Sequence, residues 1–174
     1  QSLPSGRALI ITTEQMSKIV DPNDIDTSVL FGDAATATII CGAQHMKIAK
    51  ARLHRPLLSA RGENGTALRV PLGGNGDFVQ MKGKKVFTEA VRRMTTMLEK
   101  ACQESGLAVT DLDLIVPHQA NGRIIEAVQS RLGNTSPRFC NAARHRGNTS
   151  SSSLPLALAK ELDEHTRGKL IGLC

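Results

Sequence analysis

The spacing of apolar residues changes along the chain, and each spacing predicts a different kind of element. Residues 8–12 (ALIIT) form the short apolar run typical of a strand, and residues 27–42 (TSVLFGDAATATIICG) contain a glycine-punctuated turn followed by a second strand. We expect both strands to lie inside a sheet. Residues 43–80 mix apolar, basic and glycine-rich pieces without a clear period, which favours strands joined by surface loops.

From Gly83 the apolar residues recur at helical spacing. Most charged residues fall between the positions of one apolar face, which holds Val86, Ala90, Met94, Met97, Leu98 and Ala101. Gly106 is placed to end this helix. The pattern predicts a long amphipathic helix from Gly83 to the residues just before Gly106.

A strand and two further helices are expected after Gly106. The sequence TDLDLIVPH (110–118) predicts a turn and a buried strand, and the next helix is expected at about 121–132, ending at Gly133. A last helix starts in the serine run 150–153 and carries the apolar positions Leu154, Ala157, Leu158 and Leu162. This alternation of strands and helices predicts an α/β layered fold.

Composition narrows the classes of function. The 174-residue chain is 40% hydrophobic, which suits one globular core of ordinary size. Four Phe and no Trp or Tyr leave few rings on which single-stranded nucleic acid could stack, so a nucleic-acid binder is disfavoured. No stretch approaches the roughly 20 apolar residues of a membrane span, and the start lacks the apolar core of a signal peptide. We therefore expect a cytoplasmic chain with no membrane partner.

The charge and the cysteines add two expectations. A net charge of +6 suits an acidic carrier protein or a phosphorylated cofactor, although a basic balance can also serve solubility alone. Cys41, Cys102, Cys140 and Cys174 form no CxxC pair and the histidines form no HExxH motif, so we expect buried thiols and no metal site. The segment PLGGNGDF (71–78) lacks the lysine and hydroxyl residue of a phosphate loop and is expected to form a tight turn.

His118 is the first candidate site residue. It follows the predicted buried strand directly, and α/β folds collect their ligands at the carboxyl ends of strands. The alternative is that Pro117 ends the strand and His118 only caps the next helix, with Asn121 accepting from backbone donors. Position alone does not separate the two interpretations.

Asn148 is the second candidate. It is the second residue of the run GNTSSSS (147–153), which leads into a helix whose free N–H groups favour negative charge, so its amide could meet a ligand oxygen. The alternative is an ordinary serine-rich helix cap, with Pro155 tolerated in the first turn. Together, the His118 imidazole and the Asn148 carboxamide could both donate hydrogen bonds to one developing oxyanion.

These segments carry a resemblance to a known family. VLFGDAATATI (29–39), IVPHQANGRI (115–124) and RGNTSSSSLPLAL (146–158) stand in this order, and about 30 residues separate His118 from Asn148. With MKGKKVFTEAVRRM (81–94), they resemble the second half of a β-ketoacyl-acyl carrier protein synthase III, of the thiolase-fold superfamily. The resemblance covers nearly the whole chain.

The resemblance implies a thiolase-like α/β fold of two similar halves, usually dimeric. A cysteine of the first half is acylated and is then attacked by the carbanion of a decarboxylating malonyl thioester, a step of fatty acid biosynthesis. His118 and Asn148 match the residues that hold the thioester oxygen as the enolate forms. Arg123 matches a position that contacts the acidic acyl carrier protein, and Phe87 matches an aromatic position at the active-site channel. Acyl-coenzyme A and malonyl-acyl carrier protein are the implied substrates, with no cofactor.

The resemblance also implies that this chain is part of an enzyme. The family's nucleophilic cysteine lies upstream of the segment matching ALIITTEQMS (8–17), and none of the four cysteines occupies that position. We expect residues 1–42 to end the first thiolase-like half, 43–80 to connect, and 81–174 to form the C-terminal thiolase-like domain, truncated before the final glycine-rich loop. The chain is then a cleaved or truncated synthase, a separately encoded subunit, or a degenerate homologue with a non-catalytic role. In each case we expect a partner, because a half-fold leaves sheet edges and an apolar face uncovered.

Overall fold

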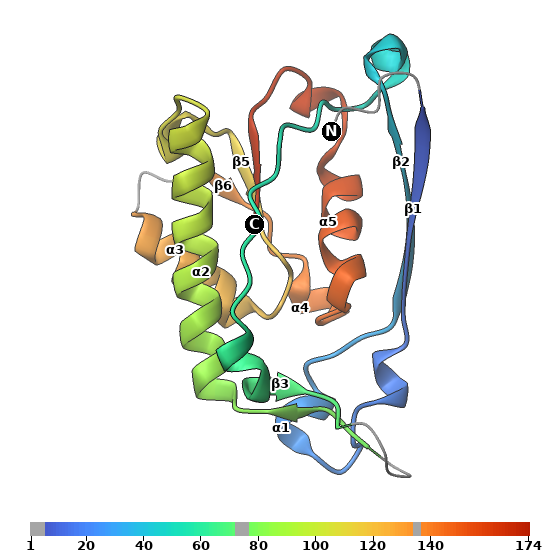
Figure 1. Ribbon diagram of the computed structural model, residues 1–174, viewed down its shortest axis with the longest axis vertical. Coiled ribbons are helices and arrows are strands. Elements are labelled where there is room, and N and C mark those ends of the chain that lie inside the picture. Colours follow the sequence, from blue (N-terminus) through green and yellow to red (C-terminus); the bar gives the residue numbers. More distant parts are fainter. Residues whose placement is uncertain (1–5, 72–76, 134–136) are drawn as a thin grey trace.

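The elements of the chain form stacked layers, as Figure 1 shows for the computed structural model. The structure describes residues 6–71, 77–133 and 137–174. Three layers contain the longer elements of the second half of the chain: the helices α2 (Gly83–Glu104) and α3 (Gly122–Leu132), a parallel sheet of β5 (Leu114–Val116), β6 (Arg138–Phe139) and β7 (Ile171–Leu173), and the helix α5 (Ser153–Glu161). A fourth layer beyond α5 is the antiparallel pair β1 (Arg7–Glu14) and β2 (Ala34–Cys41).

Short elements connect the layers. They are the helices α1 (Ile25–Ser28) and α4 (Ala143–Arg146), the paired strands β3 (Leu68–Arg69) and β4 (Gln80–Met81), and 3₁₀ turns at Met16–Lys18, Ala43–Ile48, Gly62–Ala67, Val109–Asp111, Ser150–Ser152 and Glu164–Thr166. The predicted α/β layered fold is confirmed. Between residues 43 and 80 the described part has two 3₁₀ turns, the strand β3 and the first residue of β4. The tight turn expected at 71–78 falls largely on residues 72–76, which lie outside the described residues.

The central sheet has strand β5 in the middle, and helices cover both of its faces. β5 pairs in parallel with β6 on one side and with β7 on the other. Ile115 packs on the α2 side with Leu98 and Cys102, whereas Leu114 and Val116 pack with residues of the α5 side. This alternation explains why LIV reads as an unbroken apolar run in the sequence: a parallel strand between two helical layers is buried on both faces.

The long helix α2 confirms the helix predicted from Gly83, but its buried face is shifted by one residue from the expected one. The buried residues are Val91, Thr95, Leu98 and Cys102, and of the predicted apolar face only Leu98 is fully buried. Thr95 is tolerated inside because its hydroxyl donates to the carbonyl oxygen of Val91 at 2.8 Å. Because the polar residue Thr95 lies on the buried face, the apolar residues of the sequence indicate a face that is one residue away from the buried one.

Both predicted helix ends are confirmed, and glycine is the reason for each. After α2, the N–H of Gly106 donates to Gln103 and that of Leu107 donates to Cys102, with Gly106 at φ +70°. These two bonds form a Schellman motif, which needs a left-handed residue. Helix α3 ends at Gly133, where φ is +94°.

The β1–β2 pair differs from the expectation that both strands lie inside a sheet. Among the described residues they pair only with each other, in a register that sets Leu9 opposite Ile39 and Ile11 opposite Ala37. The face with Leu9, Ile11 and Ile39 is 59–69% exposed, whereas the opposite face turns toward the serine run before α5. The apolar sequence therefore marks a face that no described residue covers.

We predict that the core around β5 dominates the stability of the chain. Ile115→Ala should lower the free energy of unfolding by about 2–5 kcal/mol, since Ile115 is 0% exposed and its truncation leaves a cavity. The matched control is Ile25→Ala at a residue 76% exposed, which should change the free energy by less than about 0.5 kcal/mol. Urea unfolding followed by circular dichroism measures both variants, and equal losses would contradict this core.

Candidate active site

His118 lies at the carboxyl end of the central strand, as the sequence predicts. β5 ends at Val116, Pro117 is fully buried, and the backbone N–H of His118 donates to Cys174 at the end of β7. The alternative role as a helix cap is wrong for His118, because Asn121 is the N-cap of α3 and its side chain accepts from the N–H of Ile124 at 2.9 Å. The imidazole is therefore free for another role.

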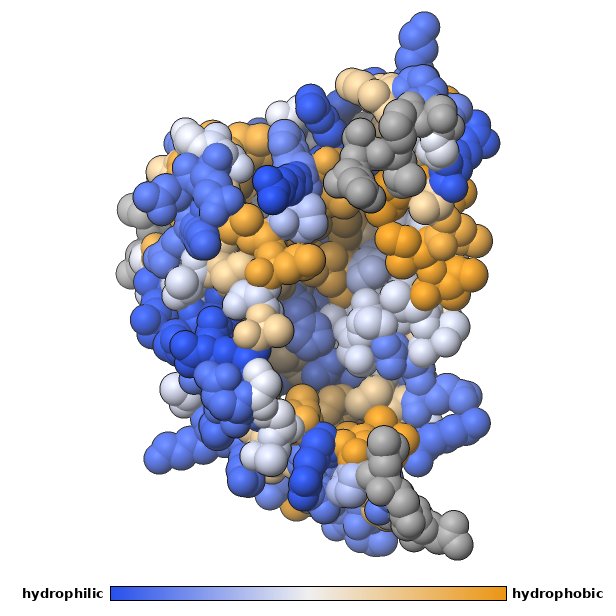
Figure 2. Space-filling model, viewed as in Figure 1, coloured by the Kyte–Doolittle hydropathy of each residue, from blue (hydrophilic) through white to orange (hydrophobic). Residues whose placement is uncertain are grey.

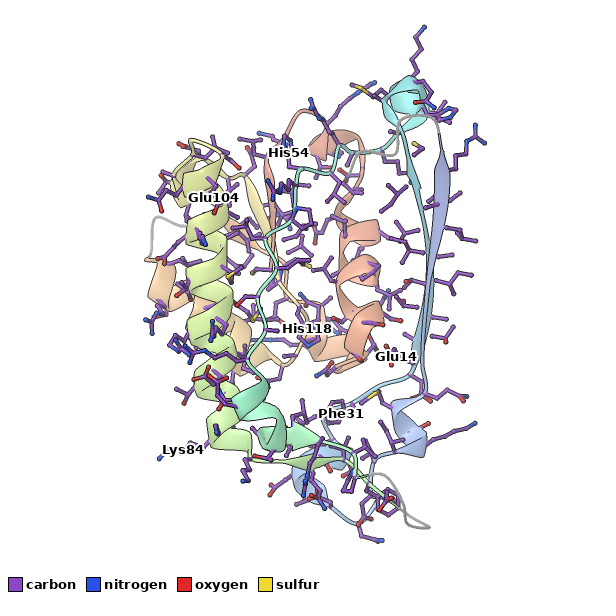
Figure 3. The ribbon with its side chains drawn as sticks, in the orientation of Figure 1. Glu14, Phe31, His54, Lys84, Glu104 and His118 are labelled. Atoms are coloured by element: carbon purple, nitrogen blue, oxygen red, sulfur yellow. The ribbon has the colours of Figure 1, made fainter. Side chains whose placement is uncertain are left out.

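The His118 imidazole is tied to the start of helix α5. Its Nδ1 lies 2.6 Å from the hydroxyl oxygen of Ser153. Figure 3 shows His118 between the end of the sheet and the amino-terminal end of α5. The other ring nitrogen, Nε2, makes no hydrogen bond to any residue that the structure describes and is not buried. One edge of the ring is thus anchored, and the other is open.

Gln119 fixes the loop that carries His118. Its side chain is buried and makes four hydrogen bonds. The amide nitrogen donates to the carbonyls of Pro117 at 2.7 Å and Cys140 at 3.3 Å, and the amide oxygen accepts from the N–H groups of Ala142 at 2.7 Å and Ala143 at 3.1 Å. These bonds join the loop after β5 to the loop after β6, which leads to Asn148.

Asn148 is held against a segment of the first half of the chain. Its backbone N–H donates to Leu30 at 2.7 Å, and its carbonyl accepts from the N–H of Gly32 at 3.0 Å, in a parallel bridge opposite Phe31. Its side-chain oxygen accepts from the N–H of Ser150 at 2.9 Å. Because a backbone donor fixes the oxygen there, the Nδ2 group faces the other way as a donor.

Two glycines make this close approach possible. A Cβ on Gly32 would lie 2.3 Å from the carbonyl oxygen of Arg146, and a Cβ on Gly147 would lie 2.8 Å from that of Leu30. Gly147 also has φ +66° and ψ −167°, a region essentially reserved for glycine. The FGD and RGN segments quoted above therefore meet backbone to backbone, and their glycines are required where they meet.

The interpretation of the serine run as an ordinary side-chain cap of α5 is wrong, whereas the anion-binding interpretation stays a prediction. No serine hydroxyl caps the 3₁₀ turn or α5. Each residue of the run has a different partner: Ser150 with Asn148, Ser151 with Glu14, Ser152 with Thr12 and Ala34, and Ser153 with His118 and Gln119. The run connects the β1–β2 pair to the end of the central sheet.

The structure thus brings His118 to the segment 148–153, which begins with Asn148. In the described part of the chain, no interaction links Arg123 or Phe87, the other two predicted site residues, to this segment. Arg123 is exposed in the first turn of α3, and Phe87 is 38% exposed near the start of α2. The sequence missed Gln119, Ser153 and the Leu30–Gly32 segment. Four consecutive serines carry no signal that tells which one reaches His118.

The electrostatic setting suits a neutral donor and not a cysteine nucleophile. Burial lowers the pKa of His118, so the imidazole is neutral at pH 7. Burial raises the pKa of Cys140 to about 11 and that of Cys174 to about 12, and it also raises the pKa of Cys102. These thiols stay protonated and are poor nucleophiles. Within residues 6–71, 77–133 and 137–174, no group of acidic, histidine and cysteine side chains could hold a metal ion.

Comparisons with known proteins find similarity along most of the chain. Residues 2–55 match the family model 3-Oxoacyl-[acyl-carrier-protein (ACP)] synthase III, and residues 102–174 match the model of its C-terminal domain. The β-ketoacyl-[acyl-carrier-protein] synthase III of Oleidesulfovibrio alaskensis is 38% identical over 168 residues, which are 90% of this chain and 51% of that protein. A synthase III of Deinococcus radiodurans is 40% identical over 161 residues, or 88% of this chain and 47% of that protein.

Solved structures show the same similarity. The synthase III of Aquifex aeolicus superposes with a TM-score of 0.83 at 32% identity, over 96% of this chain and 53% of that one. The enzyme of Thermus thermophilus gives a TM-score of 0.80 at 34% identity, over 96% of this chain and 54% of that one. The fold is therefore the thiolase-like α/β fold of these condensing enzymes.

The chain belongs to the 3-oxoacyl-[acyl-carrier-protein] synthase III family. It spans about half the length of the curated relatives that it matches. In the part that the structure describes, no helix is both long and apolar enough to cross a membrane.

We predict that acidification destabilises the chain through His118. Burial lowers its folded-state pKa below the unfolded value near 6.5, so just below that pH the unfolded chain binds more protons and stability falls as the pH falls. One such group contributes at most about 1.4 kcal/mol per pH unit. His118→Gln should therefore lose less unfolding free energy than the wild type between about pH 7.5 and about pH 5.5.

The matched control is His54→Gln, at an exposed residue of the segment between β2 and β3. This variant should keep the full pH dependence of the wild type. Urea unfolding at both pH values measures all three proteins. A wild-type loss no larger than that of His118→Gln would contradict the burial of the neutral imidazole.

Proposed function

We propose that this chain supplies the oxyanion-stabilising half of a 3-oxoacyl-acyl carrier protein synthase III. The reaction is the decarboxylative Claisen condensation of an acyl thioester with a malonyl thioester. As carbon dioxide leaves, negative charge develops on the malonyl thioester oxygen. The His118 imidazole and the Asn148 amide each donate a hydrogen bond to that oxygen and stabilise the enolate.

The observation that carries this proposal is the attachment of both donors to residues 148–153. His118 is anchored through Ser153, and Asn148 is anchored through the N–H of Ser150. In Asn148 the anchored atom is the side-chain oxygen, which leaves the Nδ2 group as the donor, and in His118 the anchored atom is Nδ1, which leaves Nε2 open. Fixed donors aimed at developing charge are the usual source of rate enhancement at such sites.

The acyl-accepting cysteine is proposed to come from a partner segment, with the assembly a homo- or heterodimer in the cytoplasm. The raised thiol pKa values disfavour Cys102, Cys140 and Cys174 as nucleophiles. The exposed apolar face with Leu9, Ile11 and Ile39 supports the proposal that a partner covers it. Figure 2 shows hydrophobic surface over part of the β1–β2 pair. We retain the division at 1–42, 43–80 and 81–174 within this proposal.

Arg123 and Phe87 are proposed to act on the substrate side. Arg123 is exposed five residues after His118, where its charge can attract an acidic acyl carrier protein that delivers the malonyl group. Phe87 is assigned to the border of the acyl channel. The acyl donor is proposed to be an acyl-coenzyme A. The alternative function is a non-catalytic subunit that only completes the fold of a partner.

The first functional prediction concerns the two donors, in the chain reconstituted with the cysteine-bearing segment. His118→Ala and Asn148→Ala should each slow malonyl decarboxylation by about 100- to 1,000-fold, as is typical for the loss of one oxyanion donor. Acylation of the partner cysteine should stay largely intact, because that step does not form the malonyl enolate. The double variant should lose less than the product of the single losses, since both groups act on one oxygen.

Two assays separate these steps: release of carbon dioxide from a malonyl thioester, and single-turnover acylation followed by intact mass. The chain alone serves as the control and should show neither turnover nor stable acylation. Decarboxylation at the wild-type rate in both single variants would overturn the site assignment. It would instead favour the non-catalytic alternative.

The second functional prediction concerns the carrier protein. In the same assembly, Arg123→Glu should raise the KM for carrier-bound malonyl groups and weaken the dependence of that KM on salt, because a favourable charge pair is lost. Arg131→Glu is the matched control at the other end of α3, where the residue is also exposed. Steady-state kinetics at low and high salt measure the effect. Equal KM changes for Arg123→Glu and Arg131→Glu would remove the specific role of Arg123.

A further inference from the structure

Ser153 is the only one of the four serines that touches the candidate catalytic histidine. Its side chain is 3% exposed, at the first residue of α5. Its hydroxyl oxygen lies 2.6 Å from Nδ1 of His118 and accepts a hydrogen bond from the backbone N–H of Gln119 at 3.2 Å. The two partners are consecutive residues, so the hydroxyl holds both the imidazole and the backbone just after it.

The position of the hydroxyl proton follows from these contacts. A serine hydroxyl has one hydrogen to donate and two lone pairs, and the N–H of Gln119 occupies one lone pair. Within the described residues, Nδ1 of His118 is the only acceptor that the Ser153 hydroxyl reaches. The adjoining cavity, lined in part by Gln119 and Ser153, has about 10 Å³, at the lower limit for a single water. The hydroxyl therefore donates to Nδ1.

A ring nitrogen that accepts a hydrogen bond carries no proton. In a neutral imidazole the proton then resides on Nε2, which makes it a donor. Nε2 is the nitrogen without a partner among the described residues, and it is not buried. Burial lowers the pKa of His118 and so keeps the ring in the neutral state to which this reasoning applies.

We propose that Ser153 is a positioning residue that holds the neutral His118 imidazole in its Nε2–H tautomer, with the Nε2–H group presented to the ligand oxygen. The identity of that oxygen rests on the proposed function, but the tautomer does not. Without the hydroxyl, Nδ1 loses its donor, and the ring is free to exchange tautomers or to turn about its side-chain bonds. Ser153 acts only through His118 and does not itself touch the substrate.

The direct test is the protonation state of the ring in the chain by itself. In ¹⁵N-labelled protein, proton-bearing and bare imidazole nitrogens have well-separated chemical shifts, and the His118 signals are assigned by their loss in His118→Gln. The wild type should show a protonated Nε2 and a bare Nδ1 at neutral pH. A protonated Nδ1 in the wild type would overturn the proposal without any need for a Ser153 variant.

Three variants test the role of the hydroxyl. Ser153→Ala should move both His118 nitrogens toward averaged shifts, whereas Ser153→Thr keeps the hydroxyl and should restore the wild-type pattern. Ser151→Ala is the matched control, because it removes a hydroxyl of the same run that contacts Glu14 and not His118. Wild-type shifts in folded Ser153→Ala would overturn the proposal.

An assay in the reconstituted enzyme connects the tautomer to catalysis. Ser153→Ala should lower kcat for decarboxylation by about 10- to 100-fold, the loss that follows when the hydrogen-bond partner of a metal-bound histidine is removed, with KM for malonyl thioester unchanged. Ser153→Thr should recover most of the rate. A fixed Nε2–H tautomer in a chain that fails to support decarboxylation would reject the proposed function alone. Averaged wild-type shifts in an active assembly would reject the role of Ser153 alone.

Discussion

The side chain of Gln119 is the constraint on which the arrangement of the site depends. A carboxamide has two N–H donors and two acceptor positions, and Gln119 uses all four inside the protein, on Pro117, Cys140, Ala142 and Ala143. Because Gln119 is 2% exposed, water cannot replace these hydrogen-bond partners, and each buried polar group left unpaired costs about 1–3 kcal/mol. The loops after β5 and β6 therefore cannot move apart independently. His118 stands at the start of one loop, and the other leads through α4 to Asn148.

The serine run adds a second connection, between the β1–β2 pair and the central sheet. On one side, Ser151 and Ser152 bond to Glu14 and Thr12 of β1. On the other side, Ser153 bonds to His118 and Gln119 beyond β5. The Asn148 backbone is bridged to the Leu30–Gly32 segment that precedes β2. The position of the candidate oxyanion donors thus depends on contacts between the two sheets, and not on the central sheet alone.

The sequence predicts the elements well where one local signal decides them. Gly106 and Gly133 end their helices in left-handed conformations, and the run LIV before Pro117 is the buried strand. It fails where partners far apart in the chain decide. Thr95 lies on the buried face of α2 because a backbone carbonyl one turn earlier accepts its hydroxyl. The strands β1 and β2 have the composition of interior strands, yet their pairing leaves one face open. The candidates His118 and Asn148 stand in motifs that the sequence shows, but Gln119 and Ser153, which contact the segments that carry them, are visible only in the structure.

The local backbone around Asn148 shows what this orientation costs. Ser150 has φ +50°, a left-handed conformation that disfavours a residue with a Cβ by about 1–2 kcal/mol. Its N–H, which has no acceptor within the 3₁₀ turn that Ser150 begins, donates to the Asn148 side-chain oxygen. A hydrogen bond of this kind contributes about 0.5–1.5 kcal/mol, which offsets much of the strain. Without this bond the Asn148 amide could turn either its oxygen or its nitrogen toward the ligand. The strained turn therefore costs a small amount of backbone energy and holds the Asn148 amide in one orientation. In the proposed reaction, that amide then needs no reorganisation when the enolate forms.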